Sequence, residues 1–528
     1  MNDDPEVDPT MAETTPARPR WHGAVAGLVS GAVAVTVGML VAGIIEVVSP
    51  IDAVGSTFID HVPAWLKDLA IRWFGTNDKI ALRVGIVVIL GFAAIAVGIV
   101  ADHRPWFGVG GIALFGLVGL LAAVSRPAEP GSAFLPSLLG ALVGAWLIYR
   151  LARGEWAGPL ATPHRSAVPL GWDRRRFLAV SGAAGATAVA AGFAAQALER
   201  NRVQHIRNEI PRALPAAAVA PGPATLPTAT SVELDPATPY FTPNADFYRI
   251  DTALSFPRID IDSWRVEIAG MVAEKLSLSY AELSALPQVQ RVVTLTCVSN
   301  DVGGDLVGNA TWQGVLLKDL LQQAGVDPAG EQVYSTSLDG WSSGFPLSVA
   351  LDGRDAMIAI GMNGQPLPLE HGFPARLVVP GLYGYVSGTK WLRKIEINRW
   401  SDAQGFWVPL GWSRDGPIKT QSRIDVPRRG DTVAAGAAKI AGVAWAQHRG
   451  VDTVEVRIDS GEWRPATLSQ DAADDAWRQW VIDWDAVPGK HTLQVRATDK
   501  TGAVQVEKVT SPAPDGATGY HTRTVTVR

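Results

Sequence analysis

Long apolar runs separated by short polar segments occupy the N-terminal part of the chain. Four of these runs contain no charged residue, and they are Ala24–Ile45, Val84–Ala101, Phe107–Ser125 and Ser132–Tyr149. Each is close to the ~20 residues that an α-helix needs to cross a bilayer. A fifth run, Phe177–Leu198, is richer in alanine and glycine. We therefore predict a disordered tail at 1–20, a four-helix transmembrane region at 21–152 and a fifth transmembrane segment at 173–200.

Arginines beside the runs predict their orientation. They precede the first run, separate the second from the third, and separate the fourth from the fifth: Arg18, Arg20, Arg104, Arg150, Arg153, Arg165 and Arg174–Arg176. Loops rich in Lys and Arg stay on the cytoplasmic side of a membrane. The N-terminus is therefore predicted to be cytoplasmic, and the chain after Leu198 extracytoplasmic.

The fifth run opens with DRRRFLAVSG, Asp173–Gly182. Two arginines, any residue and then Phe-Leu resemble a twin-arginine export signal. Positive flanking by Arg174–Arg176 is the alternative explanation. The AQA of Ala195–Ala197 offers a cleavage pattern, but the four preceding helices favour retention of the segment as an anchor.

A change in pattern marks the second half of the chain. A Pro/Ala-rich stretch at 208–240 predicts an extended linker. Residues 241–400 mix β-like and helix-like runs, which is typical of an α+β domain. Residues 415–528 carry alternating strands such as TVEVRID and HTLQVRATD. Turn signals separate these strands, and the pattern predicts an immunoglobulin-like sandwich.

Composition agrees with membrane segments joined to a folded domain, since hydrophobic residues make up 47% and charged ones 18%. A net charge of −5 gives no sign of nucleic-acid binding. The chain has one cysteine, Cys297. One cysteine excludes an intrachain disulfide, a CxxC zinc site, a four-cysteine iron–sulfur cluster and a CxxCH haem attachment. No histidine lies inside an apolar run, so no transmembrane haem is expected either.

Cys297 ends a β-like run and is followed by a loop rich in Gly and Asn, in RVVTLTCVSNDVGGDLVGN. A strand that ends in such a loop can place a side chain at the floor of a cavity, with backbone amides facing a ligand. A thiolate suits a soft metal. The alternative is a buried free cysteine that packs as a small hydrophobe.

Further motifs favour the metal. They are HGFPARLVVPG (His371–Gly381), KWLRKI (Lys390–Ile395), W-x-G-V-x-L-x-D-L-L (Trp312–Leu321) and KTQSRIDVP (Lys419–Pro427). Together with the cysteine loop, they resemble the molybdopterin-binding oxidoreductases of the sulfite oxidase superfamily, from about Tyr240 to Arg528. The resemblance implies an α+β cofactor domain at 241–400 and a dimerisation domain at 415–528, hence a homodimer.

The resemblance also implies a site. Cys297 falls at the position of the molybdenum-ligating thiolate, and the remaining cofactor-binding positions are Asn244, Tyr248, Arg249, Ser337, His371, Arg376, Gly388, Thr389 and Lys390. Arg, Lys and backbone amides are natural ligands for the phosphate of the pterin. Ordinary structural roles are the alternatives: a turn cap for His371, a strand ion pair for Arg376 and a solvated Lys390.

The sequence departs from sulfite oxidases where substrate would bind. Those enzymes follow the cysteine with Ala-Gly-Asn-Arg-Arg, whereas Asp301 and Val302 stand at the two arginine positions here. Ile250–Thr252 replaces their Arg-Asn-His, and Trp341 replaces their substrate-pocket tyrosine. A pocket with fewer cations should bind sulfite poorly.

We therefore expect a membrane-anchored, extracytoplasmic enzyme that carries out oxygen-atom transfer on a small oxo substrate. It would hold a molybdenum–molybdopterin cofactor and no haem or iron–sulfur cluster. Electrons would be exchanged with an external cytochrome or quinone-linked protein. The alternatives are sulfite oxidation to sulfate, or a non-catalytic membrane-tethered binding protein with the same fold.

Overall fold

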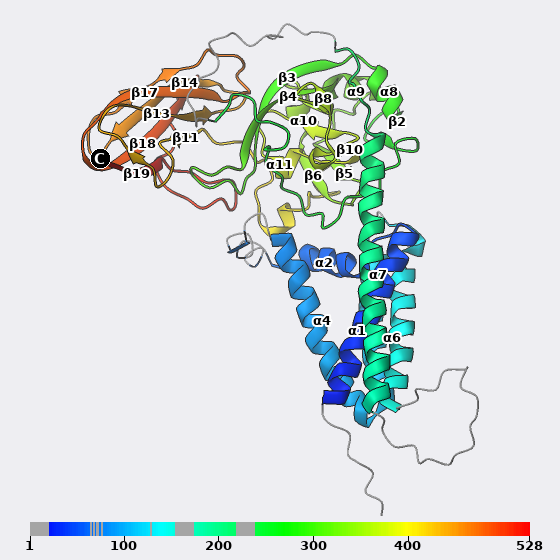
Figure 1. Cartoon of the computed structure of the whole chain (residues 1–528). Coiled ribbons are helices and arrows are strands. Elements are labelled where there is room, and N and C mark those ends of the chain that lie inside the picture. The colour runs from blue at the N-terminus through cyan, green and yellow to red at the C-terminus, as the bar shows by residue number, and fades with distance from the viewer. Residues whose placement is uncertain are drawn as a thin grey trace, which may run out of the picture. The chain divides into compact units, whose positions relative to one another are not determined.

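The structure is a computed structural model that describes residues 21–63, 66, 69, 73–74, 78–126, 129–153, 174–217 and 238–528. The predicted tail at 1–20 and most of the predicted linker, 218–237, lie outside the described residues. The chain divides into a helical unit, Met1–Gln204, and a β-rich unit, His205–Arg528. Figure 1 shows the helices in blue to green and the sheets in green to red.

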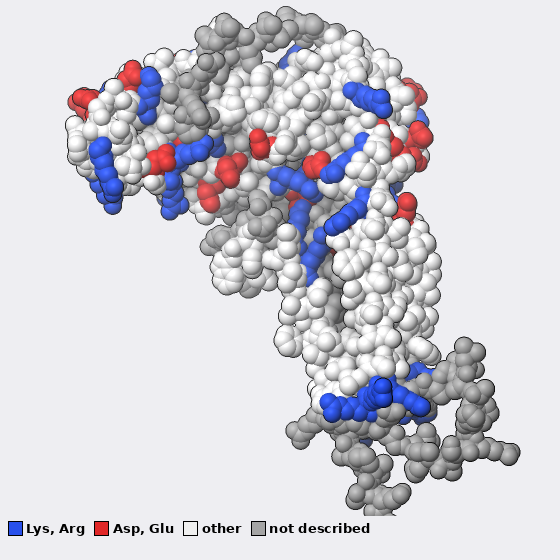
Figure 2. Space-filling model, in the orientation of Figure 1, with Lys and Arg blue, Asp and Glu red and all other residues white. Residues whose placement is uncertain are grey.

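The helical unit contains the predicted apolar segments. Its described helices are α1 (Trp21–Ile44), α2 (Pro50–His61), α4 (Asp78–His103), α5 (Pro105–Val124), η2 (Gly131–Phe134), α6 (Leu135–Arg153) and α7 (Arg174–Glu209). Five segments are long and apolar enough to cross a membrane: α1, α4, α5, η2 with α6, and α7. Large apolar side chains such as Phe92 and Phe193 are about 70% exposed on α4 and α7, as expected for surfaces that face lipid. On this unit, Figure 2 shows a broad face without charged side chains and a group of Lys and Arg at one end.

Small residues let the helices of this unit approach closely. A Cβ on Gly27 would lie 2.0 Å from the backbone oxygen of Ala94, and one on Gly98 would lie 2.1 Å from that of Gly23. Only glycine therefore fits where α1 crosses α4.

Phe177 of α7, from the DRRRFL segment, is fully buried.

The β-rich unit begins with an α+β domain, here called the cysteine domain (238–412). One sheet has the order β2-β1-β10-β5-β6, in which only β1 and β10 pair in parallel; the other has the order β3-β4-β7-β8, with β9 also paired to β7. The strands are β1 (Arg265–Gly270), β2 (Leu276–Ser279), β3 (Val289–Thr296), β4 (Val307–Leu316), β5 (Gln332–Ser337), β6 (Ser342–Pro346), β7 (Met357–Met362), β8 (Gln365–Pro366), β9 (Arg376–Val378) and β10 (Leu392–Asn398). The helices are α8 (Tyr280–Ala285), α9 (Leu317–Ala324), α10 (Leu347–Leu351), η3 (Leu369–His371), α11 (Gly384–Ser387) and η4 (Val408–Leu410).

The C-terminal domain (415–528) has two sheets, of order β11-β13-β17-β16 and β12-β19-β18-β14-β15. Its strands are β11 (Gln421–Val426), β12 (Thr432–Val433), β13 (Gly436–Trp445), β14 (Val451–Ile458), β15 (Arg464–Pro465), β16 (Thr467–Leu468), β17 (Arg478–Ala486), β18 (Gly489–Asp499) and β19 (His521–Val527). Apolar side chains from both sheets, such as Ile440 and Val495, form one buried core. The described residues thus form the predicted two-sheet unit, and its immunoglobulin-type topology stays a prediction.

Two boundaries differ from the sequence prediction. α7 continues past residue 200 to Glu209, although its apolar pattern ends at Leu198. The first residues of the predicted linker also lie against the cysteine domain, since Gln313 Nε2 donates to the Pro215 carbonyl at 2.8 Å. The described part of the linker is therefore anchored.

Candidate active site

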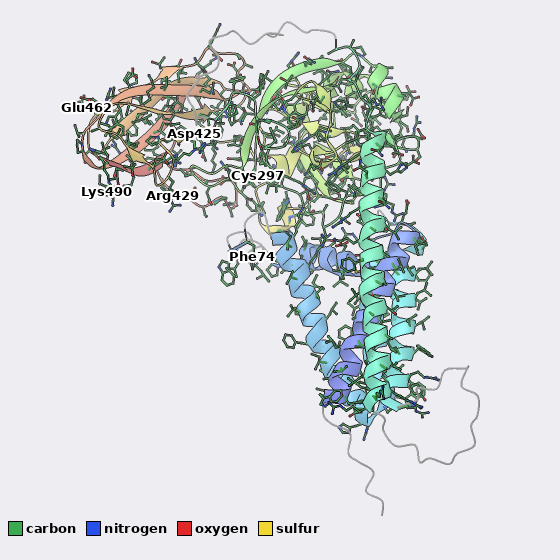
Figure 3. All side chains as sticks on the ribbon, viewed as in Figure 1. Phe74, Cys297, Asp425, Arg429, Glu462 and Lys490 are labelled. Atoms are coloured by element: carbon green, nitrogen blue, oxygen red, sulfur yellow. The ribbon has the colours of Figure 1, made fainter. Side chains whose placement is uncertain are left out.

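Cys297 directly follows β3, at the base of a closed loop that ends where β4 begins. Its backbone N–H donates to Leu306 O at 2.9 Å, and its carbonyl accepts from Asn300 N at 3.0 Å. The buried Asn300 side chain accepts from Leu306 N at 2.8 Å. These bonds fix the backbone on both sides of the cysteine. Figure 3 labels Cys297 within the cysteine domain.

The Cys297 thiol is free and lies among polar groups. Burial raises its pKa, while the backbone and side chain of Ser299 and the charge of Lys390 act in the opposite direction. A raised pKa keeps the thiol protonated near neutral pH. A bound metal ion would stabilise the thiolate and release this proton.

Three cations, Lys390, Arg249 and Arg376, form one cluster, and the charge of Lys390 also acts on the Cys297 thiol. Lys390 Nζ lies 2.7 Å from Asp251 Oδ2, and Arg249 Nε lies 2.9 Å from the same oxygen. Arg376 is 7% exposed, and its guanidinium lies 4.9 Å from the centre of the Trp312 ring. Glu370, which is paired with Arg207, adds a second carboxylate beside Arg249, and the cluster as a whole keeps an excess of positive charge.

Arg376 is the unusual member of the cluster. Within the described residues, its hydrogen bonds are long ones to backbone carbonyls, at 3.3 Å to Leu377 O and 3.4 Å to His371 O. Burial lowers its pKa to about 10, and burial lowers that of Lys390 to about 8, against the opposing effect of Asp251. A buried cation is normally paired, so the cluster is suited to an anionic ligand.

His371 lies beside Arg376, whose guanidinium donates to the His371 carbonyl. Its Nε2 lies 2.8 Å from Asn244 O, and a carbonyl can only accept, so Nε2 carries the hydrogen. Burial lowers the pKa of His371 to about 4. The ring is therefore neutral at pH 7, with Nδ1 as an acceptor. Phe247 packs edge-on against it, with ring centres 5.6 Å apart.

Tyr248 lies next to both the cysteine and the buried arginine. Burial raises the pKa of its hydroxyl, the charge of Cys297 raises it further, and the charge of Arg376 lowers it. The hydroxyl is therefore protonated at neutral pH and available as a donor. The structure thus brings together six of the predicted residues: Cys297, Tyr248, Arg249, His371, Arg376 and Lys390.

The other predicted residues shape the surroundings. Gly388 packs closely against the start of α11, because a Cβ there would lie 3.0 Å from both Cα and O of Gly384. The buried Thr389 hydroxyl lies 2.8 Å from both Ser335 Oγ and Ser343 Oγ. Asn244 Oδ1 accepts from Asn363 Nδ2 at 2.8 Å.

Ser337 and Trp341 belong to one turn. Ser337 N donates to Trp341 O at 2.8 Å, and Ser337 Oγ accepts from Asp339 N at 3.3 Å. Their roles in binding stay predictions.

Sequence reasoning missed three residues of the site. Asp251 was seen only as a departure from the sulfite oxidase pattern, yet it pairs with two of the cations. Trp312 was seen only as part of a motif, yet its ring lies under Arg376. Tyr383 is buried with its pKa raised to about 12 by burial, and it lies within electrostatic reach of Cys297. Its position in GLYGYVSG, next to the predicted Gly388, was the available signal.

These residues fit a molybdenum–pterin cofactor. A thiol beside a loop of backbone amides suits a soft metal. The buried, incompletely paired Arg376 and the adjacent Lys390 suit a phosphate group. The Nε2 hydrogen of the neutral His371 is used by the Asn244 carbonyl, so Nδ1 is left as an acceptor for a donor group on the edge of a pterin ring.

Comparisons with known proteins agree with this fit. Residues 253–407 match the family described as oxidoreductase molybdopterin binding domain. The mitochondrial sulfite oxidase of Homo sapiens is 31% identical over 318 residues, a match that covers 51% of this chain and 58% of the human protein. The chain thus spans less than two thirds of that relative. The sulfite oxidase of Gallus gallus is 31% identical over 320 residues, covering 51% of this chain and 69% of the chicken protein.

Among solved structures, the crystal structure of the sulfane dehydrogenase SoxCD from Paracoccus pantotrophus is similar with a TM-score of 0.49 and 22% identity, covering 61% of this chain and 92% of that one. The sequence relatives carry the assignment, and they favour an enzyme over a non-catalytic binding protein. The chain belongs to the sulfite oxidase superfamily and is a molybdopterin-dependent oxidoreductase.

Proposed function

We propose that the protein is a membrane-anchored, extracytoplasmic enzyme that transfers an oxygen atom to or from a small, uncharged oxo substrate such as a sulfoxide. The observation that carries the proposal is the charge distribution around Cys297. The cations near it are paired or suited to the cofactor, and the loop that follows the cysteine adds Asp301.

Different residues of the site would hold different parts of the cofactor. When bound, the molybdenum cofactor supplies two-electron oxygen-atom transfer. Cys297 Sγ would ligate the metal, Arg376 and Lys390 would hold the anionic end of the pterin, and His371 would bind the pterin through Nδ1. The protonated Tyr248 hydroxyl would donate a hydrogen bond near the metal.

The substrate preference follows from the positions of the nearby arginines. Arg423 of β11 reaches the cysteine loop, but its Nε lies 2.6 Å from Asp425 Oδ1 and its Nη1 donates to Gly304 O at 2.8 Å. Arg523 is likewise engaged, with Nη1 donating to Pro427 O at 2.7 Å. A dianion such as sulfite needs cations free to pair with it. An uncharged oxo group needs only donors, such as a hydroxyl or an N–H.

The membrane arrangement supports the location. Five apolar helices and the arginine groups beside them favour a cytoplasmic N-terminus and an extracytoplasmic catalytic domain. The twin-arginine-like segment would allow export after the cofactor has been inserted. Reduction of a sulfoxide to a sulfide and water consumes two electrons and two protons. An external cytochrome or quinone-linked protein would supply the electrons, and the C-terminal domain would form a homodimer.

The test is a substrate comparison on the detergent-solubilised, molybdenum-loaded full chain. We expect sulfoxide-dependent oxidation of a reduced viologen dye, with a kcat/KM at least about tenfold above that for sulfite with an oxidised acceptor, equivalent to ~1.4 kcal/mol. A higher kcat/KM for sulfite would overturn the proposal.

Sulfite oxidation is the second candidate, because the curated relatives that are 31% identical are sulfite oxidases. Binding of a dianion should weaken as salt rises, whereas binding of an uncharged sulfoxide should not. The salt dependence of KM therefore separates the two candidates.

A further inference from the structure

The C-terminal domain closes the outer edge of the cysteine strand β3. This strand is the last of its sheet. Thr294 N donates to Asp475 O at 2.9 Å, and Trp477 N donates to Thr294 Oγ1 at 2.7 Å. Gln447 Nε2 donates to Thr294 O at 3.0 Å and to Thr296 Oγ1 at 3.2 Å. An edge strand otherwise presents unpaired backbone groups, so these bonds hold β3 in place.

Arg423 of the same domain holds the loop after the cysteine. Besides the bonds to Asp425 and Gly304, its Nη2 donates to Thr238 Oγ1 at 2.9 Å. Each of its three nitrogens therefore has an acceptor, and the side chain is 9% exposed. Asp425 and Cys297, both labelled in Figure 3, thus belong to two domains that this one arginine connects.

His521, at the start of β19, packs against the same loop. Gly303 has φ +77°, and a Cβ there would lie 2.4 Å from both Nε2 and Cδ2 of His521. The imidazole therefore occupies the space beside the Gly303 backbone. Its Nδ1 accepts from Ile424 N at 2.9 Å, which places the hydrogen of the neutral ring on Nε2. Burial lowers the pKa of His521 to about 4, so the ring stays neutral at pH 7.

We propose that the C-terminal domain forms a structural half of the cysteine site, with His521, Arg423 and Gln447 as positioning residues for the Cys297 sulfur. Gln447 fixes the strand that enters the cysteine, while Arg423 and His521 fix the loop that leaves it. The sulfur is then held in one orientation toward the metal, as outer groups orient metal ligands in general. The inference rests on the molybdenum site of the proposed function, and it is independent of which substrate is used.

The test uses the molybdenum-loaded full chain with Arg423→Met, Arg423→Lys and His521→Ala. The first readout is the Mo(V) electron paramagnetic resonance spectrum of chemically reduced enzyme, which needs bound metal and no substrate. We expect Arg423→Met and His521→Ala to change this spectrum at near wild-type molybdenum content. We also expect both to lower kcat by about 10- to 100-fold, as is usual when groups behind a metal ligand are removed.

Controls separate positioning from a general effect on folding. Arg423→Lys should partly restore the spectrum, because an ammonium can still donate to Gly304 O. Arg457→Met should leave it unchanged, because Arg457 stacks on Trp463 at 4.6 Å, on a surface formed within the C-terminal domain. A wild-type spectrum in both Arg423→Met and His521→Ala would overturn the inference. A wild-type protein that binds no molybdenum would instead overturn the proposed function.

Discussion

Arg376→Met should stabilise the protein without its cofactor and weaken the binding of the cofactor. Burial lowers the pKa of Arg376 from 12.5 to about 10. At 1.36 kcal/mol per pKa unit, the charged guanidinium costs on the order of 3 kcal/mol in the empty site. Methionine can keep the apolar contact with Trp312 and removes the charge.

With the cofactor bound, the same substitution has the opposite effect. A hydrogen bond to a charged group contributes about 1.5–3 kcal/mol. Its loss should weaken cofactor binding by about 10- to 150-fold. Thermal unfolding of cofactor-free and loaded protein, with assays of pterin and molybdenum, measures both effects. Arg393→Met, at an exposed position on β10, is the matched control. If Arg376→Met lowers the unfolding temperature of the cofactor-free protein and leaves the cofactor content unchanged, Arg376 is a structural cation and the reasoning is wrong.

Three further predictions concern pH, substrate charge and export. Because burial lowers the pKa of Lys390 to about 8, binding of inorganic phosphate to the cofactor-free site should weaken as pH rises through about 8. Asp251→Asn, which removes the group that raises this pKa, should shift the loss toward neutral pH in a phosphate titration; an unchanged profile would contradict the pairing. The double variant Asp301→Arg with Val302→Arg should lower the KM for sulfite by about tenfold or more and leave the KM for a neutral sulfoxide unchanged. Equal effects on the two KM values would argue against charge as the determinant of substrate choice. Arg174→Lys with Arg175→Lys should abolish protease access to the catalytic domain from outside spheroplasts, whereas Arg176→Lys should not; continued access in the double variant would refute twin-arginine export.

The apolar pattern predicted the five long apolar helices well, because an uninterrupted run of apolar residues of about 20 positions is itself the signal of a helix that could span a membrane. It missed the end of α7, where the sequence becomes charged. There the helix carries local side-chain pairs: an ion pair with Arg202 Nη2 2.6 Å from Glu199 Oε1, and a polar contact with His205 Nε2 3.2 Å from Glu209 Oε1. Such pairs support a helix without an apolar run.

The motifs predicted the residue types of the site but not all of its pairings. Cys297, Arg376 and Lys390 could be found because each lies in a recognisable local pattern. Asp251 could not be assigned to Lys390, which is 139 positions away, because only the fold brings them together. The contacts of His521 and Arg423 with the cysteine loop were missed for the same reason, since no local pattern links β19 or β11 to residues 303–304.

Molybdenum K-edge X-ray absorption on the purified full chain tests the central claim most directly. In the wild type we expect a metal bound by pterin sulfurs and one protein sulfur. In Cys297→Ser we expect one sulfur fewer around the metal, with the pterin still present and turnover lost. An unchanged sulfur shell in Cys297→Ser, or full turnover by that variant, would contradict the account.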